Sequence, residues 1–292
     1  MSPKSILALT MIGVFMFMSA AEASDRIAYS RLTDGYWQIW TIAPDGTDQH
    51  KITDSPMDKR DPVWIKDGKA IVFRTNNGQL FMFDLAVKKE QELLTQFKNI
   101  VNPHYCNVTG EIVFVQFDPQ AIDAGNIWKS DWEGRHPVVL SRDNILKYQP
   151  NFSPQGDKIA FVKTDSATKS HNIWIMDADG GSPRQLTREK GLSTLPSFAP
   201  DGRALTFTSN FKDKNYDIYL LDIASLRVTR LTQHPGLDTY SRFSPDGTKL
   251  IFVSNRGGNQ QIWVMNKDGS GAKQITSGDA ESVSPAWGEI KE

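Results

Sequence analysis

Short runs of alternating apolar and polar residues follow one another along the chain, and they recur as copies of one phrase. Each copy contains an isoleucine or leucine followed directly by an aromatic residue. These pairs are Ile39-Trp40, Leu80-Phe81, Ile127-Trp128, Ile173-Trp174, Ile218-Tyr219 and Ile262-Trp263. Successive aromatic positions lie 41 to 47 residues apart. Alternation predicts β-strands, and six strand-rich repeats of this length predict a β-propeller with six blades.

Four strands, A to D, are expected in each repeat. Strand A carries a Pro-x-aromatic phrase, as in residues 196–202, and strand B is an apolar alternation such as 159–162. Strand C holds the isoleucine-aromatic pair. Strand D is short and ends in Leu-Thr or Ile-Thr, as at Leu186-Thr187. The β-branched and aromatic residues of these segments favour pleated, half-buried positions.

The connection between strands A and B reads Ser-Pro-Asp-Gly at 244–247, and Asp-Gly pairs recur between strands C and D. Serine and proline suit the first two positions of a β-turn, and glycine accepts the positive φ that follows. We therefore interpret these aspartates as turn residues and not as catalytic carboxylates.

The two ends of the pattern predict how the ring closes. The first repeat starts at 26–29, which has the pattern of a strand B, and residues 284–287 carry a strand A phrase with no strand B after it. We expect this C-terminal strand to complete the first blade, so that no sheet end stays open. The predicted fold is all-β, a six-bladed propeller of four-stranded antiparallel blades spanning residues 24–292.

Residues 1–23 have the three parts of a secretory signal peptide. Lys4 supplies a positive start, 6–20 are apolar, and Ala21 and Ala23 are the small residues before a cleavage site. The apolar run is shorter than the roughly 20 residues of a membrane span. We expect cleavage after Ala23 and a periplasmic protein that is not integral to the membrane; an uncleaved anchor is the alternative. The residue directly after the cleavage site is Ser24 and not a cysteine, which excludes a lipoprotein.

The formal net charge of −1 does not suggest a nucleic-acid partner, which would require a basic face. Cys106 is the only cysteine, so an internal disulfide is excluded. It occupies the place of a serine in other repeats and is expected to be a buried structural thiol; a reactive or intermolecular thiol is the alternative.

Residues 243–256 (Phe-Ser-Pro-Asp-Gly-Thr-Lys-Leu-Ile-Phe-Val-Ser-Asn-Arg) and 262–266 (Ile-Trp-Val-Met-Asn) resemble the TolB-type propeller repeat, a WD40-like repeat (PD40) of bacterial envelope proteins. The resemblance covers the mature chain and is strongest over 148–288. It implies a propeller that docks a lipoprotein or an unstructured peptide in its central funnel. TolB proteins also carry an α/β domain before the propeller. Here six repeats fill residues 24–292, so we expect a stand-alone TolB-like protein.

Binding residues are expected in the loops between blades and between strands B and C, because these vary while the A–B and C–D turns are uniform. The expected funnel rim is Arg60, Asp61, Asn102, His104, Tyr148, Gln149, Thr194, Tyr240 and Arg242. The loop candidates are Tyr36, Trp37, Asn255 and Arg256. Such a rim fits a protein or peptide partner, with an envelope lipoprotein as one candidate, and a monomer is expected. The alternatives are a funnel that holds only water and aromatic residues that merely cover the blade beneath them.

Enzyme chemistry has little support in the sequence. There is no Gly-x-Ser-x-Gly motif, and the five histidines show no close metal-ligand spacing. We expect no catalytic residue, no cofactor and no metal site. The alternative is a carbohydrate-active propeller, either a uronate-polymer lyase or a glycan binder, because some propellers with this repeat are polysaccharide lyases with an axial metal. Only His104 with Asp61 and Gln149 resembles such a site for a divalent cation.

Overall fold

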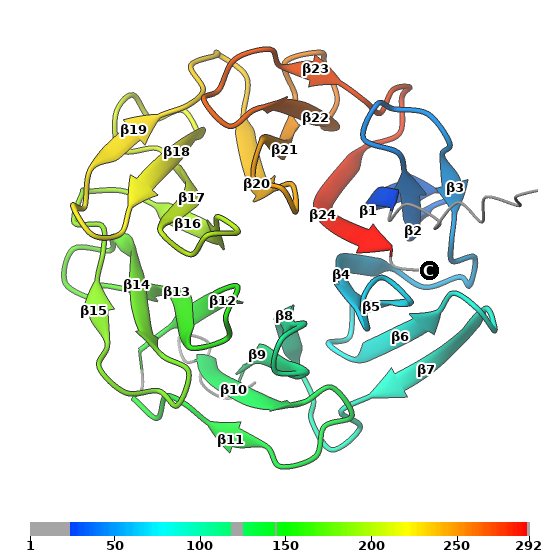
Figure 1. Cartoon of the computed structure of the whole chain (residues 1–292), viewed down its shortest axis with the longest axis horizontal. Helices are drawn as coiled ribbons and strands as arrows, with labels where there is room; N and C mark the ends of the chain where they lie inside the picture. Colours follow the sequence, from blue (N-terminus) through cyan, green and yellow to red (C-terminus); the bar gives the residue numbers. More distant parts are fainter. Residues whose placement is uncertain (1–23, 118–124, 144, 291–292) are drawn as a thin grey trace, which may run out of the picture.

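The structure, a computed structural model, describes residues 24–117, 125–143 and 145–290. They form six four-stranded antiparallel sheets arranged in a ring around a central axis (Figure 1). The six-bladed propeller predicted from the repeats is therefore confirmed. The described residues include no helix long and apolar enough for a membrane crossing. The predicted signal peptide, residues 1–23, lies outside them.

The strands of each blade are given from the axis outwards. Blade 1 consists of β24 (Ser282–Ile290), β1 (Ser24–Thr33), β2 (Tyr36–Ile42) and β3 (His50–Lys51). Blade 2 consists of β4 (Lys59–Ile65), β5 (Ala70–Thr75), β6 (Leu80–Asp84) and β7 (Lys89–Leu93). Blade 3 consists of β8 (Ile100–Cys106), β9 (Glu111–Phe117), β10 (Gly125–Asp131) and β11 (Val138–Val139).

The remaining blades follow the same order of strands A to D. Blade 4 consists of β12 (Lys147–Phe152), β13 (Lys158–Thr164), β14 (His171–Asp177) and β15 (Arg184–Gln185). Blade 5 consists of β16 (Ser193–Phe198), β17 (Ala204–Ser209), β18 (Asp217–Asp222) and β19 (Val228–Arg230). Blade 6 consists of β20 (Asp238–Phe243), β21 (Lys249–Ser254), β22 (Gln261–Asn266) and β23 (Lys273–Gln274).

Every inner strand contains a β-bulge at the same place. In blade 2 the register steps from Arg60↔Arg74 to Val63↔Val72, so two residues of β4 lie opposite one residue of β5. The other inner strands show the same shift. The residue at the bulge has a φ between 50° and 56° in all six blades: Asp61, Asn102, Gln149, Leu195, Tyr240 and Ser284. Because a bulge re-aims side chains, it decides which residues face the axis.

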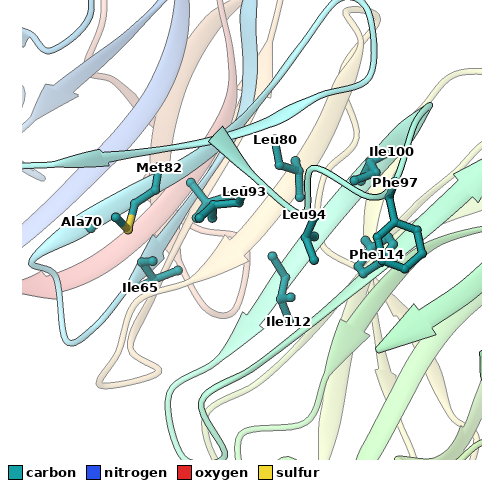
Figure 2. Packing of buried hydrophobic residues seen from close by; sticks show 11 residues of the cluster. Ile65, Ala70, Leu80, Met82, Leu93, Leu94, Phe97, Ile100, Ile112 and Phe114 are labelled. Atoms are coloured by element: carbon teal, nitrogen blue, oxygen red, sulfur yellow. The ribbon is translucent and has the colours of Figure 1, made fainter. Parts of the chain in front are cut away.

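The hydrophobic core lies between neighbouring blades. Figure 2 shows the layer between blades 2 and 3, where Ile65 and Leu93 face Ile112 and Phe114. The rings of Phe97 and Phe114 meet edge to face with centroids 5.0 Å apart. Full burial of each such side chain stabilises the fold by about 1.5–3 kcal/mol. Each blade therefore depends on its neighbour for burial of its apolar face.

The threonine that ends strand D has a structural role. The Thr187 hydroxyl accepts a hydrogen bond from the backbone N–H of Ile173 at 2.9 Å and donates to Asn172 Oδ1 at 3.2 Å. The equivalent residues Thr53, Thr232 and Thr276 make the same pair of contacts. This arrangement, the strand D clamp, explains the recurring Leu-Thr and Ile-Thr pairs.

The ring closes as predicted, because β24 pairs with β1 and becomes the inner strand of blade 1. The Trp287 indole N–H donates to Asp25 Oδ2 at 3.1 Å, and the Trp64 indole N–H donates to the carbonyl of Ala286 at 3.1 Å. A Cβ at Gly288 would lie 2.4 Å from the Trp64 ring. The C-terminal strand thus joins the first blade and packs closely on the second.

Cys106 is a buried free thiol, as the repeat position predicts. It lies at the end of β8 and packs against the A–B turn of blade 4. A Cβ at Gly156 would lie 2.9 Å from its sulfur and 2.6 Å from Thr109 Cγ2. The thiol fills the space between two blades.

Candidate functional site

The candidate site is a cavity of about 350 Å³ on the propeller axis. It is surrounded by the inner strands of all six blades, which Figure 1 shows around the centre. The bulge residues form one ring of its wall, here called the bulge ring: Ser284, Asp61, Asn102, Gln149, Leu195 and Tyr240. Two residues further along each strand lies the second ring: Ala286, Val63, His104, Asn151, Ser197 and Arg242. The two rings are therefore mainly polar, and they include the phenol of Tyr240, the imidazole of His104 and the guanidinium of Arg242.

The cavity reaches the face that carries the A–B turns. Asp67, Asn107 and Pro245, which belong to these turns, line it and are exposed to solvent. The described parts of the loops between blades contribute no residue to the wall. The expectation placed binding residues on the opposite face, so the structure shifts attention to the A–B turn side.

The predicted rim residues divide into two groups. Those that line the cavity are Asp61, Asn102, His104, Gln149, Tyr240 and Arg242. Arg60, Tyr148 and Thr194 do not line it, because each precedes a bulge residue and faces away from the axis. The Arg60 guanidinium lies 3.9 Å from the centroid of the Trp37 ring. The Tyr148 hydroxyl is hydrogen-bonded to His171 Nδ1.

Side chains of the bulge ring connect neighbouring blades. The backbone N–H of Gln149 donates to Asn102 Oδ1 at 3.3 Å. The Gln149 side chain in turn accepts the backbone N–H of Leu195 at 2.7 Å through Oε1. These contacts fix the two amide side chains, so this part of the wall is held in one arrangement.

Side chains of the second ring also connect neighbouring blades by accepting backbone hydrogen bonds. His104 Nδ1 accepts the backbone N–H of Phe152 at 3.2 Å, and Asn151 Oδ1 accepts the backbone N–H of Phe198 at 3.3 Å. Burial, together with the positive charge of Arg242, lowers the pKa of His104 to about 3. His104 is therefore neutral at physiological pH. Because Nδ1 accepts a hydrogen bond, its proton lies on Nε2.

The two charged residues of the rings differ in their partners. Asp61 Oδ2 accepts a hydrogen bond from Arg74 Nε at 2.6 Å, and its Oδ1 accepts one from the Ser284 hydroxyl at 3.0 Å. Arg242 donates to the carbonyl of Ser241 at 3.2 Å. Among the described residues, no aspartate or glutamate oxygen lies within the 4.0 Å of an ion pair from Arg242. Burial lowers the pKa of Arg242 below its ordinary value.

A family model for the TolB beta propeller domain matches residues 76–212 and 130–290 of the chain. Together these ranges cover well over half of its 292 residues. The chain belongs to the TolB beta-propeller family. No curated protein matches it in sequence.

Solved structures of the same shape agree with the TolB family. TolB from Acinetobacter baumannii has a TM-score of 0.79 at 21% identity, over 90% of this chain and 66% of that one. A putative TolB from Agrobacterium tumefaciens has a TM-score of 0.73 at 18% identity, over 92% and 91%. This chain thus spans just under two thirds of the Acinetobacter protein. At these identities the likeness concerns the fold alone.

An oligogalacturonate lyase in complex with manganese has the same architecture, with a TM-score of 0.61 at 16% identity over 87% of this chain and 74% of that one. In this TolB propeller the expected metal set, His104, Asp61 and Gln149, does line one cavity. However, Asp61 is paired with Arg74, His104 Nδ1 is occupied, and Arg242 brings a positive charge. No group of three histidine, cysteine, aspartate or glutamate side chains that could hold a metal ion occurs among the described residues. The set does not fit a divalent cation.

The loop candidates mostly hold the TolB propeller together. Trp37 has an exposed fraction of only 8% and packs between blades 1 and 6, whereas Tyr36 is 41% exposed. Asn255 Oδ1 accepts the backbone N–H of Leu237 at 2.7 Å. Of these residues, Tyr36 presents a free aromatic surface.

Arg256 forms an ion pair with a buried carboxylate. Its Nη2 donates to Asp238 Oδ2 at 2.6 Å, and Asp238 is fully buried at the start of β20. The guanidinium also lies 5.0 Å from the Trp263 ring and 5.3 Å from the Phe252 ring. These contacts favour a structural role for Arg256.

Sequence reasoning missed half of the residues in the two rings. Leu195 and Ser284 complete the bulge ring, and Val63, Asn151, Ser197 and Ala286 complete the second ring. The signal that would have found them is the shared position relative to the Pro-x-aromatic phrase, because the bulge occurs at the same place in every blade.

Proposed function

We propose that this TolB-family propeller is a non-catalytic binding module that docks a segment of a protein or a peptide in its axial cavity. The observation that supports the proposal is the wall of that cavity. Its amides and imidazole are fixed by hydrogen bonds to neighbouring blades, and Tyr240 and Arg242 add an aromatic and a cationic contact. Such residues are frequent anchors of protein interfaces. A prearranged wall also reduces the entropy that binding costs.

The setting of this function is part of the same proposal. The segment 1–23 has the pattern of a signal peptide, which supports a periplasmic location, and the proposal takes the protein as a monomer. An envelope lipoprotein, or a peptide segment of an envelope protein, is the class of partner that the family suggests. We do not advance the lyase alternative, because the charge and the occupied ligand atoms of the cavity disfavour a cation.

Photo-crosslinking in intact cells tests the docking proposal. A photoreactive amino acid replaces Asn107, which lines the cavity at the A–B turns. A second variant carries it at Asp201, an exposed residue of another A–B turn outside the cavity wall. A third carries it at Tyr36 on the opposite face.

The expected result is one discrete protein adduct from position 107 and none from positions 201 and 36. An adduct from position 36 alone would move the docking site to the face of the interblade loops. If no position gives an adduct, the protein-docking proposal is wrong.

A further inference from the structure

Arg242 is the feature of the cavity that the fold itself does not explain. Within the part of the chain that the structure describes, its guanidinium makes one hydrogen bond, to the neighbouring backbone carbonyl of Ser241, and forms no ion pair. Two other arginines with mostly buried side chains do have acidic partners: Arg230 pairs with Asp217 at 2.5 Å and Arg256 with Asp238 at 2.6 Å. A charge removed from water is costly unless it is paired.

The nearby carboxylate is already occupied. Asp61 is near enough to Arg242 to influence its titration, but its two oxygens are used by Arg74 and Ser284. The imidazole of His104 is neutral and supplies no negative charge. Arg242 is therefore a cation on the cavity wall that has no ion-pair partner among the described residues.

The two rings contain further hydrogen-bond donors. The guanidinium presents a planar fork that suits the two oxygens of a carboxylate. His104 keeps its Nε2–H, since Nδ1 is used by blade 4, and Tyr240 carries a hydroxyl in the adjacent ring. The cavity volume of about 350 Å³ lies within the range of ligand pockets, about 300–1,000 Å³.

We propose that the axial cavity is a carboxylate-binding site in which Arg242 pairs with an acidic side chain or the C-terminal carboxylate of the docked polypeptide. This deepens the proposed function and rests on it. A carboxylate carries one charge and neutralises one guanidinium. A phosphate carries nearly two at neutral pH and would leave a surplus negative charge beside Asp61.

Binding of short peptides by the purified protein tests the site. The probes are acetyl-Gly-Glu-Gly-amide, its counterpart with Gln in place of Glu, acetyl-Gly-Gly-Gly with a free C-terminus, and inorganic phosphate, all at one ionic strength. The variants are Arg242→Gln, Arg242→Lys as the conservative change, and Arg227→Gln, which removes an exposed arginine of a C–D turn as the control. Calorimetry gives the affinities, and thermal unfolding gives Tm.

The expected result has three parts. At least one carboxylate peptide binds at least tenfold more tightly than the Gln peptide. Arg242→Gln abolishes this preference, Arg242→Lys retains part of it, and Arg227→Gln leaves it unchanged. The Tm of Arg242→Gln equals or exceeds that of the unaltered protein, because no internal ion pair is lost. Binding of the Glu peptide or the free C-terminus identifies which carboxylate the site takes.

Several outcomes would overturn the proposal: equal affinity for the Glu and Gln peptides, tighter binding of phosphate than of either carboxylate peptide, or a drop in Tm of Arg242→Gln. The crosslinking experiment distinguishes failure of the carboxylate proposal from failure of the docking proposal. A protein adduct from position 107 that survives Arg242→Gln undiminished would preserve docking and refute the carboxylate contact. Carboxylate binding by the purified protein without any adduct in cells would preserve the carboxylate site and refute the docking of a protein.

Discussion

His104 shows how its surroundings fix the protonation state of a single residue in the cavity wall. Its Nδ1 holds the backbone of blade 4, and burial together with Arg242 keeps the ring neutral. Asn151 has the equivalent position in the next blade, and its Oδ1 accepts the equivalent backbone hydrogen bond from blade 5. An asparagine at position 104 is therefore a natural replacement that keeps an acceptor but cannot titrate.

We predict that His104→Asn flattens the pH dependence of stability. The pKa of His104 is about 3 in the folded protein and about 6.5 in an unfolded chain. Between these values the unfolded chain binds more protons, so the free energy of unfolding falls as pH falls from about 6.5 to 3. In the variant this loss becomes smaller, although His171, whose pKa burial also lowers, still contributes. Urea unfolding at pH 4, 5.5 and 7.5 measures the free energy of unfolding of both proteins.

The comparison at pH 7.5 serves as the internal control, where the variant stays within about 1 kcal/mol of the unaltered protein. An identical pH slope in both proteins would show that His104 is not held neutral by the fold.

At the scale of elements, the strand D clamp decides how each outer strand is attached. Thr187→Val keeps the shape of the side chain but removes its hydroxyl. The N–H of Ile173 and the amide of Asn172 then lose a partner in a buried place. We predict a loss of about 1–3 kcal/mol in the free energy of unfolding, measured by denaturant titration.

Thr229→Val is the matched control, because Thr229 is exposed on the outer strand β19. Valine suits such a position, so no loss is expected there. An equal loss in both variants would mean that the clamp hydroxyl contributes nothing specific.

The inner strands also show where prediction from sequence ends. The repeats, the turns and the orphan strand A at 284–287 led to six blades and to the closing strand, because period and turn chemistry are local properties of the chain. The bulge is different. Its positive φ occurs at Asp61, Gln149, Leu195 and Tyr240 alike, and residues this diverse do not reveal a left-handed backbone.

The unseen bulge affected the site directly. It shifts the alternation by one residue, so that Arg60 and Tyr148 face away from the axis while Leu195 and Ser284 join the wall. The apolar or small nature of the last two gave no chemical signal. Likewise, Trp37 contacts Arg60 of the next blade and Arg256 contacts Asp238 of its own blade, and only the folded structure shows that these residues stabilise the fold.

At the scale of the whole molecule, stability depends on closing the ring. Each blade buries its apolar face on the next, so an open ring would expose one face of blade 6 and the inner edge of blade 1. The strand β24 removes both: it pairs with β1, and Val283 packs in the cluster that joins blades 6 and 1.

A chain that ends at Glu281 is therefore predicted to lose cooperative folding. It lacks β24, so the backbone groups of β1 are left unpaired along a buried edge, which favours pairing with other chains. A chain that ends at Ile290 keeps β24 and is the control. We expect the control to unfold in one sharp thermal transition as a monomer, and the shorter chain to show a broad transition at lower temperature and to associate on size-exclusion chromatography. A sharp, unchanged transition in the shorter chain would mean that five blades and three strands suffice, and that the closing strand serves a purpose other than stability.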